Sequence, residues 1–194
     1  IKQKGQLYVS YSPSYTLNNS DKRTNQYDSA AYSYTHLDTL LTNTFENTII
    51  THKPGLGFRV RGEKLMVNVG ADFQSLSLVG NQLFPDIASV NKTFLSVLPK
   101  LMTRMRWTKE KEMRVFYSTS TQVPSVAQLQ SVVDNSNPMS LSTGNSNLKQ
   151  QYVHSLVFRY NYTNATSGKS FFAFINGIAI NNYIANSTTI ATGD

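Results

Sequence analysis

Six stretches of the chain alternate apolar and polar residues with a period of two, the pattern of a β-strand with one apolar face, and a seventh stretch at 170–185 is fairly apolar on both faces. In one of them, Leu65, Val67 and Val69 alternate with polar positions such as Asn68. Most of the stretches run to a dozen residues or so, whereas strands of soluble sheets average about five or six. They also exceed the roughly 9–11 residues that cross a bilayer. The predicted strands cover residues 7–17, 45–61, 65–79, 93–107, 112–121, 152–163 and 170–185.

The connections between these strands alternate in length. Short turns at 62–64, 108–111 and 164–169 alternate with long loops at 18–44, 80–92 and 122–151. Transmembrane barrels have this rhythm, with short periplasmic turns and long extracellular loops. A soluble sheet with one wet face would explain the alternation, but neither the strand length nor the rhythm. The predicted fold class is therefore all-β: an antiparallel up-and-down transmembrane β-barrel portion of about seven long strands.

Cationic residues indicate which face of each strand avoids lipid. Lys100, Arg104 and Arg106 share one face of the 93–107 strand, and Arg114 lies on the next strand. An arginine at the lipid midplane would cost about 2–4 kcal/mol. These four residues are therefore predicted to face the lumen, and the apolar residues between them to face lipid.

Aromatic residues near strand ends indicate where the membrane interfaces lie. Trp107, Tyr15, Phe45, Tyr160 and Tyr162 occupy such positions. Aromatic girdles of barrels sit at both interfaces. We expect these five side chains to belong to the girdles.

Composition excludes several other classes of protein. The net charge is +7, but Lys and Arg are scattered over many segments, which disfavours a nucleic-acid partner. The absence of cysteine removes disulfides and thiolate metal sites. His36, His52 and His154 are far apart and lack metal-ligand spacing. No nucleophile, acid–base pair or phosphate loop has a second partner, so we predict no catalytic residue, no metal, no cofactor and no enzyme.

The loop after residue 121 carries a helix signal. Pro124 suits a first helical turn, and Val126, Leu129 and Val133 follow at helical spacing. Asp134 and the next residue, Asn, supply a stop signal. One short helix is predicted here.

The same loop carries two motifs in order. Residues 123–129 read VPSVAQL and residues 144–149 read GNSNLK, with DNSNP at 134–138 between them. Placed between two strands, this pair resembles the paired loop motifs of TonB-dependent outer-membrane receptors, most closely the Bacteroidetes-type outer membrane β-barrel family. The chain departs from that pattern at Ser146, where Pro is usual, and at Gln150 and Gln151, which replace Pro-Glu.

The resemblance implies a bacterial outer-membrane location and uptake of a large, scarce substrate: an iron chelate, cobalamin, a glycan or a peptide. It implies partners too: the lipid bilayer, the TonB system acting through a plug, and a surface lipoprotein. Residues 1–194 would be one excerpt of the barrel domain, about a third of the wall if the barrel has about 22 strands, with the plug outside it. Ligand or partner contacts are expected in the loop, at Val123, Pro124, Gln128, Gln130, Asp134, Asn135, Asn145 and Asn147.

A different class of protein also fits part of the pattern. A secreted or surface β-sandwich, or a small barrel, could bind carbohydrate or protein through loops rich in Tyr and Asn. The long predicted strands disfavour this alternative.

Overall fold

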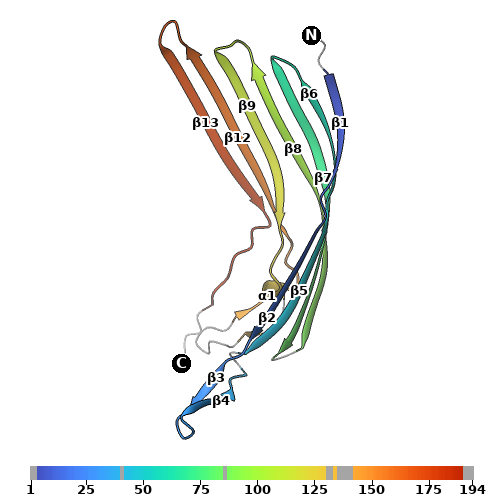
Figure 1. Ribbon diagram of the computed structural model, residues 1–194, viewed down its shortest axis with the longest axis vertical. Coiled ribbons are helices and arrows are strands. Elements are labelled where there is room, and N and C mark those ends of the chain that lie inside the picture. The colour runs from blue at the N-terminus through green and yellow to red at the C-terminus, as the bar shows by residue number, and fades with distance from the viewer. Residues whose placement is uncertain (1–3, 40–41, 85–86, 130–132, 135–141, 190–194) are drawn as a thin grey trace.

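The computed structural model describes residues 4–39, 42–84, 87–129, 133–134 and 142–189. One curved antiparallel sheet dominates them, and the short turns gather at its upper end while the long connections gather at its lower end (Figure 1). Its strands are β1 (Lys4–Tyr11), β2 (Ser14–Lys22), β5 (Asn43–His52), β6 (Pro54–Arg61), β7 (Leu65–Phe84), β8 (Ala88–Arg106), β9 (Lys111–Gln122), β12 (Gln151–Asn164) and β13 (Lys169–Asn181).

The strand order shows that these nine segments act as seven long strands. The order is β1-β6-β7-β8-β9-β12-β13, with β5 pairing both β2 and β7. β1 and β2 are one strand interrupted at Pro13, whose missing amide proton cannot join a ladder. β5 and β6 are one strand interrupted at Lys53, and together they pair along β7. The predicted antiparallel order is confirmed, and the sheet is not closed into a barrel.

The remaining elements lie at the end of the sheet opposite the short turns. They are the hairpin β3 (Asn25–Asp28) and β4 (Ser33–Leu37), the helix α1 (Val126–Leu129), and the short pair β10 (Val133–Asp134) and β11 (Ser142–Thr143). The predicted helix is therefore present but spans four residues only. Val133 belongs to β10 instead of a last helical turn.

Cross-strand register assigns every strand residue to one of two faces. We call the face that carries Arg104 and Leu78, and against which α1 packs, the loop face. The other, which carries Leu101 and Val69, is the opposite face. Lys100, Arg104, Arg106 and Arg114 all lie on the loop face.

The polarity of the two faces reverses along β7 and β8. Toward the short turns, the opposite face is apolar and exposed, with Val69 at 45% and Phe73 at 55%. Beyond Phe73 the same face carries Ser75 and Ser77. On the loop face the order is inverted: polar residues near the short turns give way to Leu76, Leu78 and Gly80. Along β7 and β8, the apolar band of the opposite face therefore covers the half nearer the short turns.

Aromatic side chains border this apolar band. Near the short turns, Trp107 lies 6.3 Å and Phe171 6.1 Å from Tyr160, measured between ring centroids. At the other border, the Tyr152 ring lies tilted against His154, with 4.9 Å between ring centroids. Tyr152 and Tyr160 lie eight positions apart on β12, roughly 27 Å along an antiparallel strand. With a barrel strand tilt of about 35–45°, this length projects to a height of about 19–22 Å, somewhat less than the apolar band of about 25 Å in outer-membrane barrels.

Two predictions from the sequence are wrong at the long-loop end. The ladder of β7 and β8 continues into the predicted 80–92 loop, because Gly80 pairs with Val90 and Asn81 with Ser89. Phe45 is not a girdle residue, because it pairs with Gln82 on the loop face, near the end of β7. Both errors have one cause: the strands extend well beyond the apolar band, where the polar and apolar faces have exchanged.

Candidate functional site

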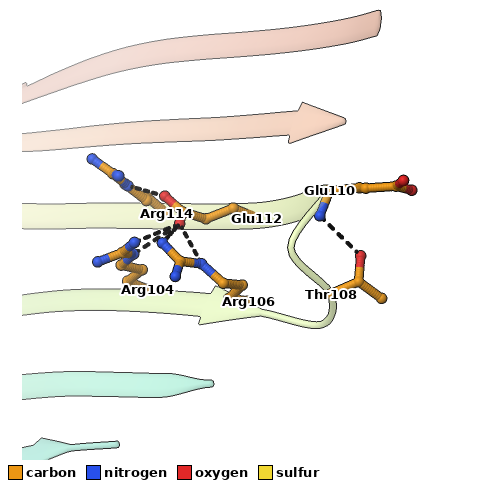
Figure 2. Close-up of polar contacts among 6 residues, drawn as sticks. All are labelled: Arg104, Arg106, Thr108, Glu110, Glu112 and Arg114. Carbon is orange, nitrogen blue, oxygen red and sulfur yellow. Dashed lines mark hydrogen bonds and ion pairs between the residues drawn. The ribbon is translucent and has the colours of Figure 1, made fainter. Parts of the chain in front are cut away.

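Three arginines converge on one carboxylate at the short-turn end of the loop face (Figure 2). Arg104 donates from Nε and Nη2 to Glu112 Oε2 at 2.9 and 2.7 Å. Arg106 donates from the same two atoms to the same oxygen at 3.1 and 2.9 Å. Arg114 Nε donates to Glu112 Oε1 at 2.6 Å. Both carboxylate oxygens are therefore occupied, and the four side chains carry a net charge of +2.

The hairpin between β8 and β9 brings these side chains together. Arg106 pairs with Glu112 across the two strands, and Arg104 pairs with Arg114. Residues two apart on a strand share a face, so the turn alone places all four on the loop face. Within the turn, the Glu110 amide donates to Thr108 Oγ1 at 3.2 Å, and the Glu110 side chain points away from the cluster (Figure 2).

The cluster belongs to a longer line of cations across the sheet. Arg114 pairs with Arg159 on β12, and Arg104 pairs with Met66, which pairs with Arg61 on β6. Arg59 lies two residues from Arg61 on the same face. The loop face near the short turns thus holds six of the seven arginines in the sequence: Arg59, Arg61, Arg104, Arg106, Arg114 and Arg159.

Two of the loop-face arginines outside the cluster, Arg59 and Arg159, contact aromatic rings. The Arg59 guanidinium lies 5.6 Å from the centroid of Tyr8, and that of Arg159 lies 5.5 Å from the centroid of Phe174. Within the part of the chain that the structure describes, no ion pair joins Arg59, Arg61 or Arg159 to a carboxylate.

Tyr8 lies flat on the same face because two glycines leave room for it. A Cβ on Gly57 would come within 2.2 Å of the Tyr8 ring, and one on Gly70 within 3.2 Å of its hydroxyl. The hydroxyl donates to Asn68 Oδ1 at 2.9 Å. Side chains at both glycines would push the Tyr8 ring away from the sheet. The two glycines therefore allow the ring to lie where the Arg59 guanidinium contacts it.

Lys100, the fourth predicted lumen residue, lies further from the short turns. Its Nζ lies 2.6 Å from Asp72 Oδ1, and the Asp72 side chain is 16% exposed. The structure thus divides the four predicted cations into two groups, three around Glu112 and one on Asp72. Glu112 and Asp72 were not predicted as site residues.

The loop between β9 and β12 packs back onto the other half of the loop face. Leu129 is 1% exposed and forms a buried cluster with Leu76, Leu78 and Val126. Gly80 provides the space, because a Cβ there would come within 2.7 Å of both Val126 methyl groups.

Polar contacts hold the two sequence motifs of this loop to each other and to the sheet. The Ser125 hydroxyl accepts from the Gln128 amide at 3.2 Å, and Gln128 Oε1 accepts from the Ser125 amide at 2.9 Å, a reciprocal cap of α1. The Asn145 amide donates to the Gln128 carbonyl at 2.7 Å, which joins the second motif to the first. Lys92 Nζ donates to the Ser146 carbonyl, and Gln150 Nε2 donates to Leu95 O at 3.2 Å.

The predicted ligand residues fall into four groups by position. Pro124 is fully buried, and Val123 packs against the Leu129 cluster. Gln128 caps α1, and the Asn145 side chain accepts from the Asn147 amide at 2.9 Å. Asp134 lies on β10. Gln130 and Asn135 lie outside the described residues.

One carboxyl group at the long-loop end has a shifted pKa. The Arg23 guanidinium, hydrogen-bonded to Asp21 at 3.2 Å, lowers the pKa of that exposed carboxyl, and the Thr44 hydroxyl assists. The contact to Thr44 ties the ends of β2 and β5 together. Because the pKa is lowered, the Arg23 contact is fully present above the usual Asp range and is lost as pH falls below it.

The described residues contain neither a metal-ligand cluster nor a long apolar helix. No group of three or more His, Asp or Glu side chains there could hold a metal ion. No helix there is long and apolar enough to cross a membrane.

The fold and the placement of its charges define a class of protein. Long antiparallel strands, short turns at one end and an apolar band edged by aromatic rings are the features of an outer-membrane β-barrel wall. The comparison with family models agrees: residues 1–192 match the outer membrane protein beta-barrel family, and the chain belongs to that family. Its location is the bacterial outer membrane. Neither the curated proteins nor the solved structures compared with the chain include a match.

Proposed function

We propose that this chain forms part of the barrel wall of a TonB-dependent transporter or receptor that takes up a large, scarce nutrient. The observation that carries the proposal is the loop between β9 and β12. Its two motifs resemble those of such receptors, and here they bind each other and hold α1 against the loop face. A loop anchored on the wall narrows the passage beside it, which suits a selective receptor better than an open general pore.

The loop face, in this proposal, lines the interior of the barrel. It carries six arginines near the short turns, and a cation facing the lipid midplane would cost about 2–4 kcal/mol. The apolar band of the opposite face then contacts the bilayer. Residues 1–194 would be one excerpt of a single barrel domain with further strands and a plug.

Adjacent residues on β12 test this orientation. Leu156 lies on the opposite face within the apolar band, and Ser155 lies on the loop face. Leu156→Arg is expected to destabilise the protein folded in lipid vesicles, lowering its free energy of unfolding by about 2–4 kcal/mol. Ser155→Arg is expected to change that free energy by less than about 1 kcal/mol, because its charge reaches water. Denaturant titrations of the full-length protein in vesicles measure both values. Equal costs at the two positions would contradict the orientation.

Ligand or lipoprotein contacts are proposed on the exposed side of the β9–β12 loop. Asn145 and Asn147 are exposed there, whereas Val123 and Pro124 support the loop from beneath. Energy would come from TonB through the plug, and the role involves no catalysis. The candidate substrates are those of such receptors: an iron chelate, cobalamin, a glycan or a peptide.

Growth under nutrient limitation tests the transport proposal. Cells lacking the parent protein are expected to lose growth on one limiting nutrient of these four kinds, and cells lacking TonB are expected to lose it too. Re-expression of the parent protein should restore growth only when TonB is present. Restoration without TonB would contradict the proposal, as would unchanged growth on every nutrient tested.

A further inference from the structure

Lysines and aromatic rings share the opposite face at the short-turn end of β9, β12 and β13. Lys111, Tyr162 and Phe171 occupy directly paired positions on these three strands. Lys169 lies two residues from Phe171 on the same face. Trp107, which follows β8, is exposed at the same end and contacts a ring of that face. We call these five residues the short-turn patch, and it lies at the border of the apolar band.

The two lysines of the patch have no anionic partner in the described part of the wall. Neither Lys111 nor Lys169 forms an ion pair there, although Lys100 on the loop face does. The carboxylate of Glu110, at the same end, accepts from Asn164 Nδ2 at 3.4 Å instead. Both lysines are exposed. The patch therefore presents two positive charges to its surroundings.

The aromatic side chains of the patch also present polar groups. Among the described residues, neither the Tyr162 hydroxyl nor the Trp107 indole N–H has a hydrogen-bond partner. Tyr and Trp are enriched where one end of the side chain meets an apolar phase and the other end meets water. Such rings lie at the level of the lipid headgroups. The free donors of the patch therefore face headgroup oxygens.

The spacing of the lysines suits one phosphate. Lys111 and Lys169 lie two strand steps and two residues apart, roughly 12 Å between Cα atoms at about 4.8 Å per step and about 3.4 Å per residue. The four-carbon stem of a lysine extends its ammonium along an apolar surface toward water. The Lys111 ammonium already lies 5.5 Å from the centroid of the Tyr162 ring, toward Lys169. Both ammonium groups can therefore reach one anion beside Tyr162.

The surroundings of the patch indicate that this phosphate belongs to a lipid. Further into the band the same face is apolar, with Met113 on β9 and the exposed Ile175 on β13. Cations above an apolar surface match the two parts of a phospholipid, its headgroup and its acyl chains. Basic clusters beside a membrane span bind anionic headgroups. A zwitterionic headgroup brings its own cation, which competes with the lysines, so the patch favours an anionic lipid.

We infer that Lys111 and Lys169, with Tyr162 between them, bind the phosphate of an anionic phospholipid whose acyl chains lie along the apolar band. Short turns of transmembrane barrels are periplasmic, so the lipid belongs to the periplasmic leaflet. The inference rests on the proposed function only in that the opposite face contacts lipid. It depends neither on TonB nor on the nutrient.

Photoactivatable lipids test the inference. The full-length protein is reconstituted in phosphatidylcholine vesicles with a trace of a lipid that carries a diazirine in its acyl chain and either a phosphatidylglycerol or a phosphatidylcholine headgroup. The phosphatidylglycerol probe is expected to label peptides containing Trp107 or Phe171 at least about fivefold more than the phosphatidylcholine probe, the preference that one lysine near an anionic lipid provides. Mass spectrometry of the digested protein measures both yields. Equal labelling by the two probes would overturn the inference.

Charge removal assigns the preference to the two lysines. Lys111→Gln with Lys169→Gln is expected to reduce the preference to about twofold or less. Lys111→Arg with Lys169→Arg keeps the charge and should retain most of it. The control Lys22→Gln with Lys64→Gln removes as much charge elsewhere on the chain and should leave the preference within about twofold of its original value. Heat-dependent migration in gels verifies that each barrel is folded. An unchanged preference in the first variant would overturn the inference.

Inorganic phosphate separates a lipid site from a site for free anions. An excess of inorganic phosphate is expected to leave the phosphatidylglycerol labelling within about twofold of that in sodium chloride at equal ionic strength, because the acyl chains hold the lipid beside the patch. Loss of the labelling in phosphate alone would indicate a free-anion site and overturn the inference.

The same probes separate this inference from the proposed function. Equal labelling of the Trp107 peptide by both probes would keep the opposite face against lipid and reject only the headgroup site. No labelling of that peptide by either probe would reject the proposed orientation itself, and the inference with it. A headgroup preference in a protein whose cells fail the growth test would leave the inference standing and the transport proposal rejected.

Discussion

Replacing Glu112 by Gln is expected to destabilise the folded barrel by about 2–3 kcal/mol. The carboxylate is 14% exposed and accepts hydrogen bonds from Arg104, Arg106 and Arg114. Gln keeps one acceptor oxygen but removes the negative charge, which leaves three arginines facing one another. The arginines are 33–43% exposed, so water screens part of the repulsion, and the loss stays below the roughly 3–5 kcal/mol typical of a fully buried pair. Urea titration of the full-length protein in lipid vesicles measures it.

Glu110→Gln is the matched control, because Glu110 is the same residue type two positions away and points away from the cluster (Figure 2). It should change stability by no more than about 0.5 kcal/mol. Salt gives a second check, since the Debye length falls from about 10 Å at 0.1 M to about 3 Å at 1 M. The difference in free energy of unfolding between the Glu112→Gln and Glu110→Gln variants should narrow as the salt concentration rises. A gap of zero at low salt would show that the arginines do not depend on Glu112.

The Glu112 cluster can be predicted from the sequence, but our sequence prediction did not include it. A tight turn at 108–111 fixes the register of the hairpin, so Arg106 must pair with Glu112 and Arg104 with Arg114. The prediction grouped the arginines on one face from the cost of burying charge in lipid, and the register places them together on the loop face, but the prediction did not carry the register across the turn. Pairing positions across each short turn would have revealed Glu112.

Arg159 could not have been added to the line in the same way. Its pairing with Arg114 spans the loop of residues 123–150, and a loop of that length leaves the register of its flanking strands free. The β13 faces were ambiguous for a related reason. Apolar residues lie on both faces of β13, and only the register with β12 assigns Phe172 and Phe174 to the loop face and Ile175 to the opposite face.

The boundary errors have a different physical origin. Period-two alternation was interpreted with one fixed rule, apolar toward lipid, which holds only inside the bilayer. Past Phe73 on β7, the loop face packs against α1, so the apolar residues of β7 change face at Ser75 and Leu76. Residues 80–92 therefore looked like a polar loop, although Val90 packs against the buried cluster.

Replacing Leu129 by Ala is expected to release α1 from the sheet. Leu129 is 1% exposed and packs with Leu76, Leu78 and Val126, and truncating such a leucine costs about 2–5 kcal/mol. The hydrogen-bond ladders of the sheet do not depend on Leu129, so the lost packing free energy weakens the docking of the loop. Amide hydrogen exchange at Asn145, whose N–H bonds the Gln128 carbonyl at 2.7 Å, should accelerate about 30-fold or more. The global unfolding transition should move little.

Leu83→Ala provides the control, because Leu83 is 56% exposed on the opposite face near the end of β7. It should leave exchange at Asn145 within about twofold. If Leu129→Ala also leaves that exchange unchanged, the packing of Leu129 does not hold the loop.

The wall side of the contact can be tested independently, because Gly80→Ala places a methyl group within 2.7 Å of the Val126 side chain. This substitution should accelerate exchange at Asn145 even though it adds apolar volume. Adding Val126→Ala removes the clashing methyl groups and should slow exchange again, relative to Gly80→Ala alone. Such a compensation is the signature of two residues in direct contact. Additive effects would show instead that Gly80 acts through the strand and not through α1.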